Sequence, residues 1–206
     1  LGVVFFTYSK GGRVKDFGRL MLGIGMMLLA LKLILAASMP MRESVIVQQI
    51  FVALGEDLIL AVVFAAILAW AAHSSLAIVL LIITLASTSV VDISVAFAFI
   101  LGANIGGALP PFIATLGASR SARQPPLGNL LFRICGVIIV LPLIDIITQR
   151  LSLWAISQAR LIATFHMFFH IAFVILFFLF IERMANCSAR LLPVDPVCSE
   201  AFQQWP

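Results

Sequence analysis

The stretch that decides the fold is LILAVVFAAILAWAAHSSLAIVLLIITLAS, residues 58–87, in which His73, Ser74 and Ser75 interrupt two apolar runs. One membrane crossing takes about 20 residues of α-helix at about 1.5 Å each. The stretch is long for one crossing and short for two crossings joined by a turn. It therefore predicts a re-entrant helical hairpin with arms at 58–72 and 76–87 and its tip at the three polar residues.

A second interruption, GANIGG at residues 102–107, follows within the next apolar run. An unpaired backbone N–H or C=O in a bilayer core costs several kcal/mol, so non-helical backbone persists there only where it lines a cavity. We expect a transmembrane helix over residues 92–116 that is broken at this segment and again at Pro110 and Pro111. Two such interruptions, close in sequence and at membrane depth, are typical of the binding site of a secondary transporter.

Composition assigns the class of protein. The chain is 63% hydrophobic and 11% charged, with a mean hydropathy of +1.17, whereas soluble domains carry about 25% charged residues. This predicts an all-α polytopic membrane protein. Basic residues are not interleaved with aromatic ones in any run, which excludes a nucleic-acid partner. No nucleophile, base and acid occur as a set, so we expect neither an enzyme nor a bound cofactor.

The remaining segments form one transporter repeat over residues 9–181. The expected order is the end of a preceding transmembrane helix at 1–8, a basic loop at 9–19, crossings at 20–37, 127–148 and 161–181, an amphipathic interfacial helix within 38–56, loops at 119–126 and 149–160, and a polar tail at 182–206. The tail contains Pro193 and Pro196 and reads as a linker.

Charge predicts the orientation in the membrane. With the 9–19 loop inside, the segments on the same side hold Lys10, Arg13, Lys15, Arg19, Arg120, Arg123, Arg183 and Arg190. The opposite side holds Arg42, Arg150 and Arg160. This asymmetry obeys the positive-inside rule and predicts a multi-pass protein of the cytoplasmic (inner) membrane with a cytoplasmic C-terminus. Two full crossings in place of the hairpin would give the same sidedness.

The two interruptions supply the candidate binding residues, which are His73, Ser74, Ser75, Gly102, Asn104, Gly106 and Gly107. The N-terminus of a half-helix attracts an anion, and glycine lets the backbone approach a ligand. Hydroxyl and carbonyl oxygens suit a small cation, so Ser74, Ser75 and Asn104 are the candidate sodium ligands. The alternative is that these small residues only allow helices to pack closely.

The same residues resemble a known family. AHSSLA at 72–77 and LGANIG at 101–106 are similar to the Gln-Ser-Ser-Ser and Gly-Ala-Asn-Ile-Gly-Thr motifs of the bacterial sodium-phosphate cotransporter family, which is related to the animal type II carriers. NLLFR at 129–133 and FHMFFH at 165–170 resemble its two His-x-Leu-Phe-Asn segments. The resemblance covers residues 15–192 or so.

The resemblance implies sodium-coupled transport of inorganic phosphate, with sodium as the coupling ion. In that family each of two inverted repeats carries both motifs, and this chain resembles one repeat, the second. The implied partners are therefore the first repeat of the same protein and a cytoplasmic PhoU-like domain after the tail.

Several positions depart from the family pattern. His73 stands in place of Gln, Leu76 in place of the third Ser, and Gly107 in place of Thr, while Asn129 and Arg133 replace His and Asn. These departures leave open a carrier of another small anion, a proton-coupled variant that uses His73, and a non-transporting membrane sensor or anchor for a regulatory domain.

Three more side chains in the apolar helices need an interpretation. His166 and His170 lie one helical turn apart, and without a carboxylate or cysteine beside them they read as packing residues bonded to neighbouring helices rather than as a metal site. His170 also stands where the family has Asn. For Arg133 we expect the side chain to extend along its helix to the cytoplasmic face.

Overall fold

The computed structural model describes residues 1–8, 12–154 and 156–193, and these are helical apart from short connections. The chain forms two compact units, Leu1–Ser44 and Val45–Pro206.

The first unit is a helical hairpin. α1, Gly2–Tyr8, packs against α2, Gly12–Glu43, and two glycines allow the approach. A Cβ on Gly18 would lie 2.6 Å from the backbone nitrogen of Phe6, and one on Gly2 would lie 2.7 Å from that of Leu22. The predicted basic loop at 9–19 is wrong for residues 12–19, because α2 already begins at Gly12. Residues 9–11 lie outside the described residues.

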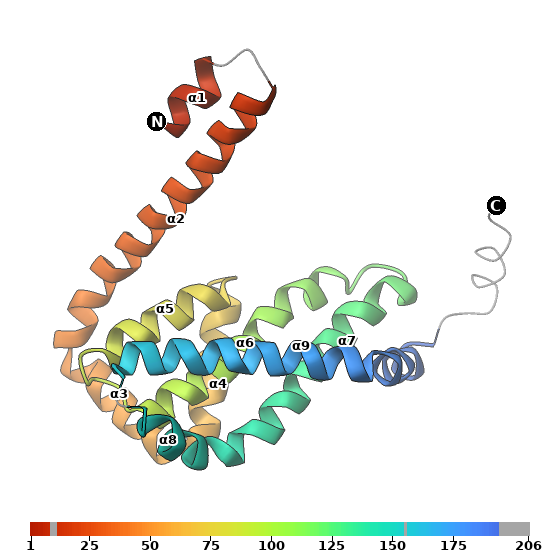
Figure 1. Ribbon diagram of the computed structural model, residues 1–206. Coiled ribbons are helices and arrows are strands. Elements are labelled where there is room, and N and C mark those ends of the chain that lie inside the picture. The colour runs from red at the N-terminus through yellow and green to blue at the C-terminus, as the bar shows by residue number, and fades with distance from the viewer. Residues whose placement is uncertain (9–11, 155, 194–206) are drawn as a thin grey trace, which may run out of the picture. The chain divides into compact units, whose positions relative to one another are not determined.

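The second unit contains the remaining helices (Figure 1). They are α3, Val45–Glu56; α4, Leu58–Ala71; α5, Ser75–Ala86; α6, Ile93–Ala114; α7, Arg120–Val140; the short 3₁₀ helix η1, Leu141–Leu143; α8, Ile144–Ser152; and α9, Gln158–Leu191.

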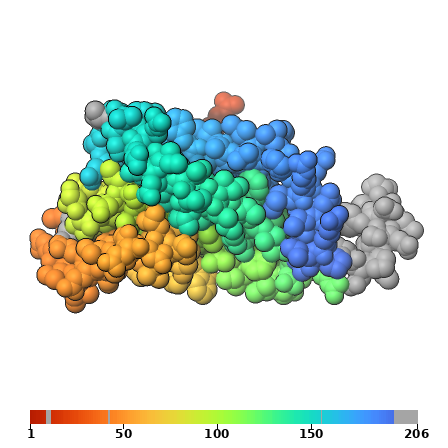
Figure 2. Space-filling view, turned by 90° about the horizontal axis from the view of Figure 1, so that it is seen from below, coloured from red at the N-terminus to blue at the C-terminus, as the bar shows by residue number. Residues whose placement is uncertain are grey.

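α6 is the centre of this unit. It packs against α4, α5, α7 and α9, and Phe97, Ile100 and Leu101 on it are fully buried. The ring of Phe97 stacks on that of Phe165 from α9 with 4.1 Å between centroids. On the face seen in Figure 2, α7 lies between α9 on one side and α3 and α4 on the other. The helix with the glycine motif is thus enclosed by its neighbours.

Among the described residues, length and composition allow four helical segments to cross a membrane, namely Gly12–Met41, Ile93–Ala114, Arg120–Ser152 and Gln158–Leu191. Large apolar side chains on α2 and α9 are exposed, among them Met26, Leu33, Val174 and Phe178. A helix that exposes leucine, valine and phenylalanine is suited to lipid. The prediction of an all-α polytopic membrane protein is confirmed.

The hairpin prediction is confirmed as a pair of helices. α4 and α5 are joined by a three-residue turn, and each is shorter than the about 20 residues that one crossing requires. The turn at residues 72–74 coincides with the predicted tip to within one residue. Whether the pair is re-entrant stays a prediction.

The predicted break within residues 92–116 is wrong. α6 runs without interruption from Ile93 to Ala114, through the GANIGG segment and through Pro110 and Pro111. The physical reason is that its glycines serve packing rather than unwinding. Gly102 and Gly106 let α4 pack closely against α6. The glycine face of α6 is therefore buried by helix packing, while α6 remains continuous.

Three further boundaries differ from the expected ones. α7 begins at Arg120, inside the expected 119–126 loop, with Pro125 and Pro126 within the helix. α8 and α9 narrow the expected 149–160 loop to residues 153–157, of which residue 155 is not described. The first ten residues of the expected tail continue α9 to Leu191, because the apolar periodicity stops before the helix does. The amphipathic helix is α3, and α2 extends through the first part of segment 38–56.

Candidate functional site

The hairpin tip is a helix stop followed by a helix start. α4 ends in a Schellman motif, in which the N–H of Ser74 donates to the carbonyl of Ala69 at 3.2 Å and the N–H of His73 donates to that of Trp70 at 3.0 Å. This motif requires a residue in the left-handed conformation, and His73 adopts it with φ of 50°. Its side chain is exposed, and Nδ1 lies 3.3 Å from the Ala71 carbonyl. His73 therefore has a structural task at this position.

Ser74 begins the next helix. It is the N-cap of α5, and its Oγ accepts a hydrogen bond from the N–H of Ala77 at 3.2 Å. A hydroxyl has two lone pairs and one proton, so Ser74 retains a donor and an acceptor after capping. The capping hydrogen bond fixes the orientation of the Ser74 side chain but leaves part of its hydrogen-bonding capacity free.

Ser75 lies against the glycine motif. A Cβ built on Gly107 would lie 3.1 Å from both Cβ and Oγ of Ser75. The structure thus brings together one residue from each of the two sequence interruptions, on α5 and α6. The missing side chain at Gly107 is what makes room for the serine.

Gly102 and Gly106 face the other way, towards α4. A Cβ on Gly102 would collide with the Val62 carbonyl oxygen and lie 2.8 Å from the Cβ of Ala65. One on Gly106 would collide with the Ala66 carbonyl oxygen. These two candidate binding residues have no open space beside them, and this contact fits the packing alternative; their role in binding stays a prediction.

Asn104 is the polar centre of α6. The residue is 4% exposed, and its Nδ2 donates to the Ile100 carbonyl at 3.1 Å. Both of its oxygens accept from Nη1 of Arg133 on α7, the backbone oxygen at 2.9 Å and Oδ1 at 3.2 Å. The expectation that Arg133 extends to the cytoplasmic face is wrong, because its guanidinium turns inward to these oxygens.

Two further neighbours hold Arg133 in this position. Its Nε donates to Oδ1 of Asn129, one turn earlier on α7, at 3.2 Å, and its guanidinium carbon lies 5.9 Å from the ring centre of Phe173 on α9. No carboxylate in the described ranges forms a salt bridge with it. Its second amino group, Nη2, has no hydrogen-bond partner among the same residues. The bundle thus holds a positive charge with donors to spare.

The histidine pair lies on α9. The rings of His166 and His170 meet edge to face, 4.4 Å apart between centroids, and Nδ1 of His166 is buried without a partner in the part of the chain that the structure describes. The packing interpretation fits this contact. The expected hydrogen bonds to neighbouring helices are not formed in these residues.

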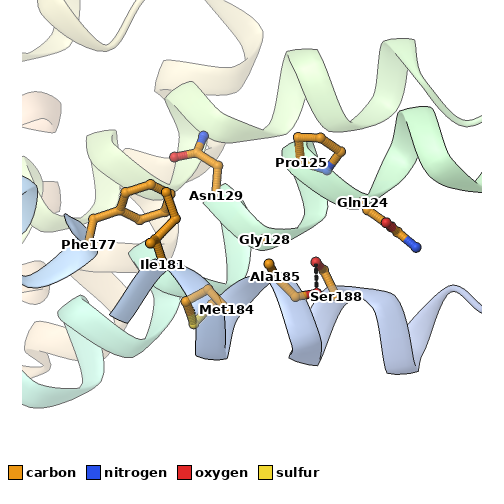
Figure 3. A pocket seen from close by; sticks show the side chains of 9 residues that line it. All are labelled: Gln124, Pro125, Gly128, Asn129, Phe177, Ile181, Met184, Ala185 and Ser188. Atoms are coloured by element: carbon orange, nitrogen blue, oxygen red, sulfur yellow. Dashed lines mark hydrogen bonds between the residues drawn. The ribbon is translucent and has the colours of Figure 1, made fainter. Parts of the chain in front are cut away.

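One cavity adjoins the Arg133 cluster, and a second, separate one is lined by acidic side chains. One of about 260 Å³ lies between α7 and α9 and contains Asn129, so it adjoins the Arg133 cluster; its other walls are mostly apolar (Figure 3). In it, the Ser188 hydroxyl donates back to the Ala185 carbonyl at 3.0 Å. The second, of about 640 Å³, lies where α4, α6 and α9 begin and is lined by Glu56, Asp92 and Asp145.

Arg133 is the residue that sequence reasoning placed wrongly. The sequence does contain a signal for the inward position of Arg133, because an ionisable residue within an apolar helix faces the bundle interior or a cavity in most membrane proteins. Asn129, one helical turn before Arg133, is a second such signal, because its side chain can accept a hydrogen bond from the guanidinium. The fold and the cluster together define a multi-pass α-helical membrane protein with a half-buried cation among its helices.

The chain is similar to longer bacterial proteins. It is 33% identical over 196 residues to the Escherichia coli K12 protein named "Putative inorganic phosphate export protein YjbB", and equally to its Salmonella typhimurium counterpart. The match covers 95% of this chain but 36% of the length of either relative. A Bacillus subtilis protein, "Uncharacterized protein YqeW", is 25% identical over 105 residues, covering 51% of this chain and 34% of that protein. No family model and no solved structure matches the chain.

Proposed function

We propose that this chain is part of a carrier that moves inorganic phosphate across the cytoplasmic membrane. The observation that carries the proposal is Arg133, a guanidinium held inside the bundle without a carboxylate partner in the described residues. Its Nη2 amino group keeps two N–H donors in the described residues, and these can bind phosphate oxygens. An intramembrane charge of this kind marks an ion pathway. The printed names of the longer relatives support the choice of phosphate among anions.

The path proposed for the anion runs along the polar residues of α5, α6 and α7. Ser75 contributes a hydroxyl donor, and no hydrogen bond to its side chain is formed within the described residues. Asn104 lies one turn of α6 before Gly107 and orients the guanidinium. We propose that phosphate bridges the free donors of Arg133 and the hairpin tip in at least one transport state.

Sodium coupling is proposed through the hairpin tip, with Ser74 and Ser75 as the cation ligands. Ser74 keeps an acceptor after capping α5, which supports this role. A proton-coupled variant that uses His73 is less favoured than sodium coupling, because the backbone conformation of His73 already has a role in ending α4. The first repeat and a cytoplasmic PhoU-like domain remain proposed partners, as does a C-terminus on the cytoplasmic side. The names of the relatives concern export, so the direction of net phosphate flux is one of the quantities that the test measures.

The test is phosphate flux in vesicles that contain the full-length protein. Radiolabelled phosphate is loaded either inside or outside, with sodium or choline as the main cation, which reports substrate, direction and coupling in one design. Arg133→Gln removes the charge but keeps a donor, and we expect about 10- to 100-fold weaker apparent phosphate affinity. Arg150→Gln, at an exposed position on α8, is the matched control and should behave as the wild type. Unaltered phosphate affinity in Arg133→Gln would refute the proposal.

A sensor or anchor without transport predicts a different result. In that case the full-length protein would show no saturable flux under any gradient, while phosphate-dependent regulation in cells would persist.

A further inference from the structure

The oxygens of Asn104 form a cation position that is already filled from within the chain. Its backbone carbonyl and its Oδ1 both point at one nitrogen, Nη1 of Arg133, at 2.9 and 3.2 Å. Two hard oxygens of one residue that converge on a point are a partial ligand set for a small cation. The residue is 4% exposed, so its oxygens have little access to water as an alternative partner.

We infer that Arg133 is a tethered cation that takes the place of a free sodium ion at Asn104. A sodium ion on the same oxygens would stand next to the guanidinium, and like charges at that separation repel strongly in a poorly solvated site. The two cations are therefore mutually exclusive. Asn104 is then a ligand of Arg133 and not, as the sequence suggested, of sodium.

The surroundings of Arg133 hold it there. Asn129 accepts from Nε, so the guanidinium cannot rotate away from Asn104 without losing a second hydrogen bond. The ring of Phe173 faces the charge at 5.9 Å, which favours a cation on this side. Three helices, α6, α7 and α9, thus contribute to keeping one permanent charge at the position.

This inference deepens the proposed function and rests on it only for the transport arm of its test. A charge that is part of the chain does not enter and leave with the substrate. We therefore expect that any sodium used by the carrier binds elsewhere. Removal of the guanidinium should add a sodium response at Asn104 to any that the wild type shows through the hairpin tip.

The first arm measures binding without transport. The unfolding midpoint of the purified full-length protein is recorded in sodium and in choline chloride at equal ionic strength. Arg133→Ala should gain a sodium-dependent rise of about 2 °C beyond that of the wild type. Arg133→Lys keeps a tethered cation and should gain none. Asn104→Ala in the Arg133→Ala background removes one of the two oxygens and should reduce the gain. If Arg133→Ala does not fold, Arg133→Gln is measured instead.

The second arm compares the sodium dependence of phosphate flux in the same variants. We expect that the Arg133→Ala flux, although weaker, depends more steeply on sodium than that of the wild type. Equal sodium responses of wild type and Arg133→Ala in the unfolding measurement, including no response in either, would overturn the inference. Absence of flux in the wild type would instead count against the proposed function and leave the unfolding result to decide this one.

Discussion

At the scale of single residues, His73 at the hairpin tip resembles a binding residue in the sequence, and in the structure it ends a helix. His73 occupies the left-handed position of a Schellman motif, a conformation that costs a non-glycine residue about 1–2 kcal/mol. Ser89 does the same after α5, with φ of 58°, and its flanking hydrogen bonds follow the same pattern. Histidine is among the residues that tolerate this region better than most.

His73→Gly should therefore preserve both the fold and phosphate flux. Glycine removes the strained Cβ, so we expect a free energy of unfolding that is unchanged or higher by about 1 kcal/mol, and a pH profile of flux that matches the wild type. His73→Val should destabilise, because a β-branched residue is poorly accommodated there. Ser89→Gly is the control, since Ser89 has the same left-handed backbone conformation but lies away from the hairpin tip. A stable His73→Gly variant that has lost flux would show that the imidazole contacts the substrate.

At the scale of elements, the pairing of α4 with α6 rests on the absence of side chains. Gly102 and Gly106 on α6 meet the carbonyls of Val62 and Ala66, and the alanines of α4 beside them are buried. Small residues at a four-residue spacing let two membrane helices approach closely enough for extensive van der Waals contact.

Gly102→Ala and Gly106→Ala should each destabilise the protein by about 1–3 kcal/mol, because the added methyl group meets backbone that cannot move aside. Thermal unfolding of the detergent-purified protein measures this. Gly128→Ala on α7 is the matched control, since its Cβ would lie 3.7 Å from Ser188, an ordinary contact. Equal stability of all three variants would mean that α4 and α6 do not pack as described.

The hairpin formed by α4 and α5 makes a second prediction at this scale. If it is re-entrant, its tip lines an aqueous cavity, so Ser74→Cys should react with a membrane-impermeant thiol reagent. Ile67→Cys, at an exposed apolar position of α4, should not react, because we expect this position to face lipid. Both variants require a background without Cys135, Cys187 and Cys198. Protection of Ser74→Cys in every transport state would favour two ordinary crossings.

At the scale of the whole molecule, the chain covers about a third of its relatives. Carriers built from repeats place the substrate between them, so with the first repeat that we propose for the full-length protein, we expect the cluster around Arg133 to form one wall of a larger site.

We expect that the 206 residues alone do not transport phosphate, whereas the full-length protein does. Both are reconstituted in parallel vesicles, and the binding of purified protein to inorganic phosphate is measured alongside. Saturable flux through the short chain would contradict a site shared between repeats.

The sequence alone determined the class of protein and the hairpin boundaries. Apolar composition leaves no soluble fold available, and the run lengths around His73, Ser74 and Ser75 permit little besides two short helices and a turn. These features depend on local composition and on the thickness of the bilayer, so they can be predicted from neighbouring residues.

The tertiary structure alone decided what the glycines and the arginine do. A glycine in an apolar helix is compatible with either an unwound segment or a close helix contact. Only the position of α4 shows that Gly102 and Gly106 form a close contact. Arg133 is long enough to extend to the membrane surface or to turn inward. The oxygens that hold it belong to Asn104, 29 residues away on another helix, and such a partner is defined by packing and not by sequence spacing.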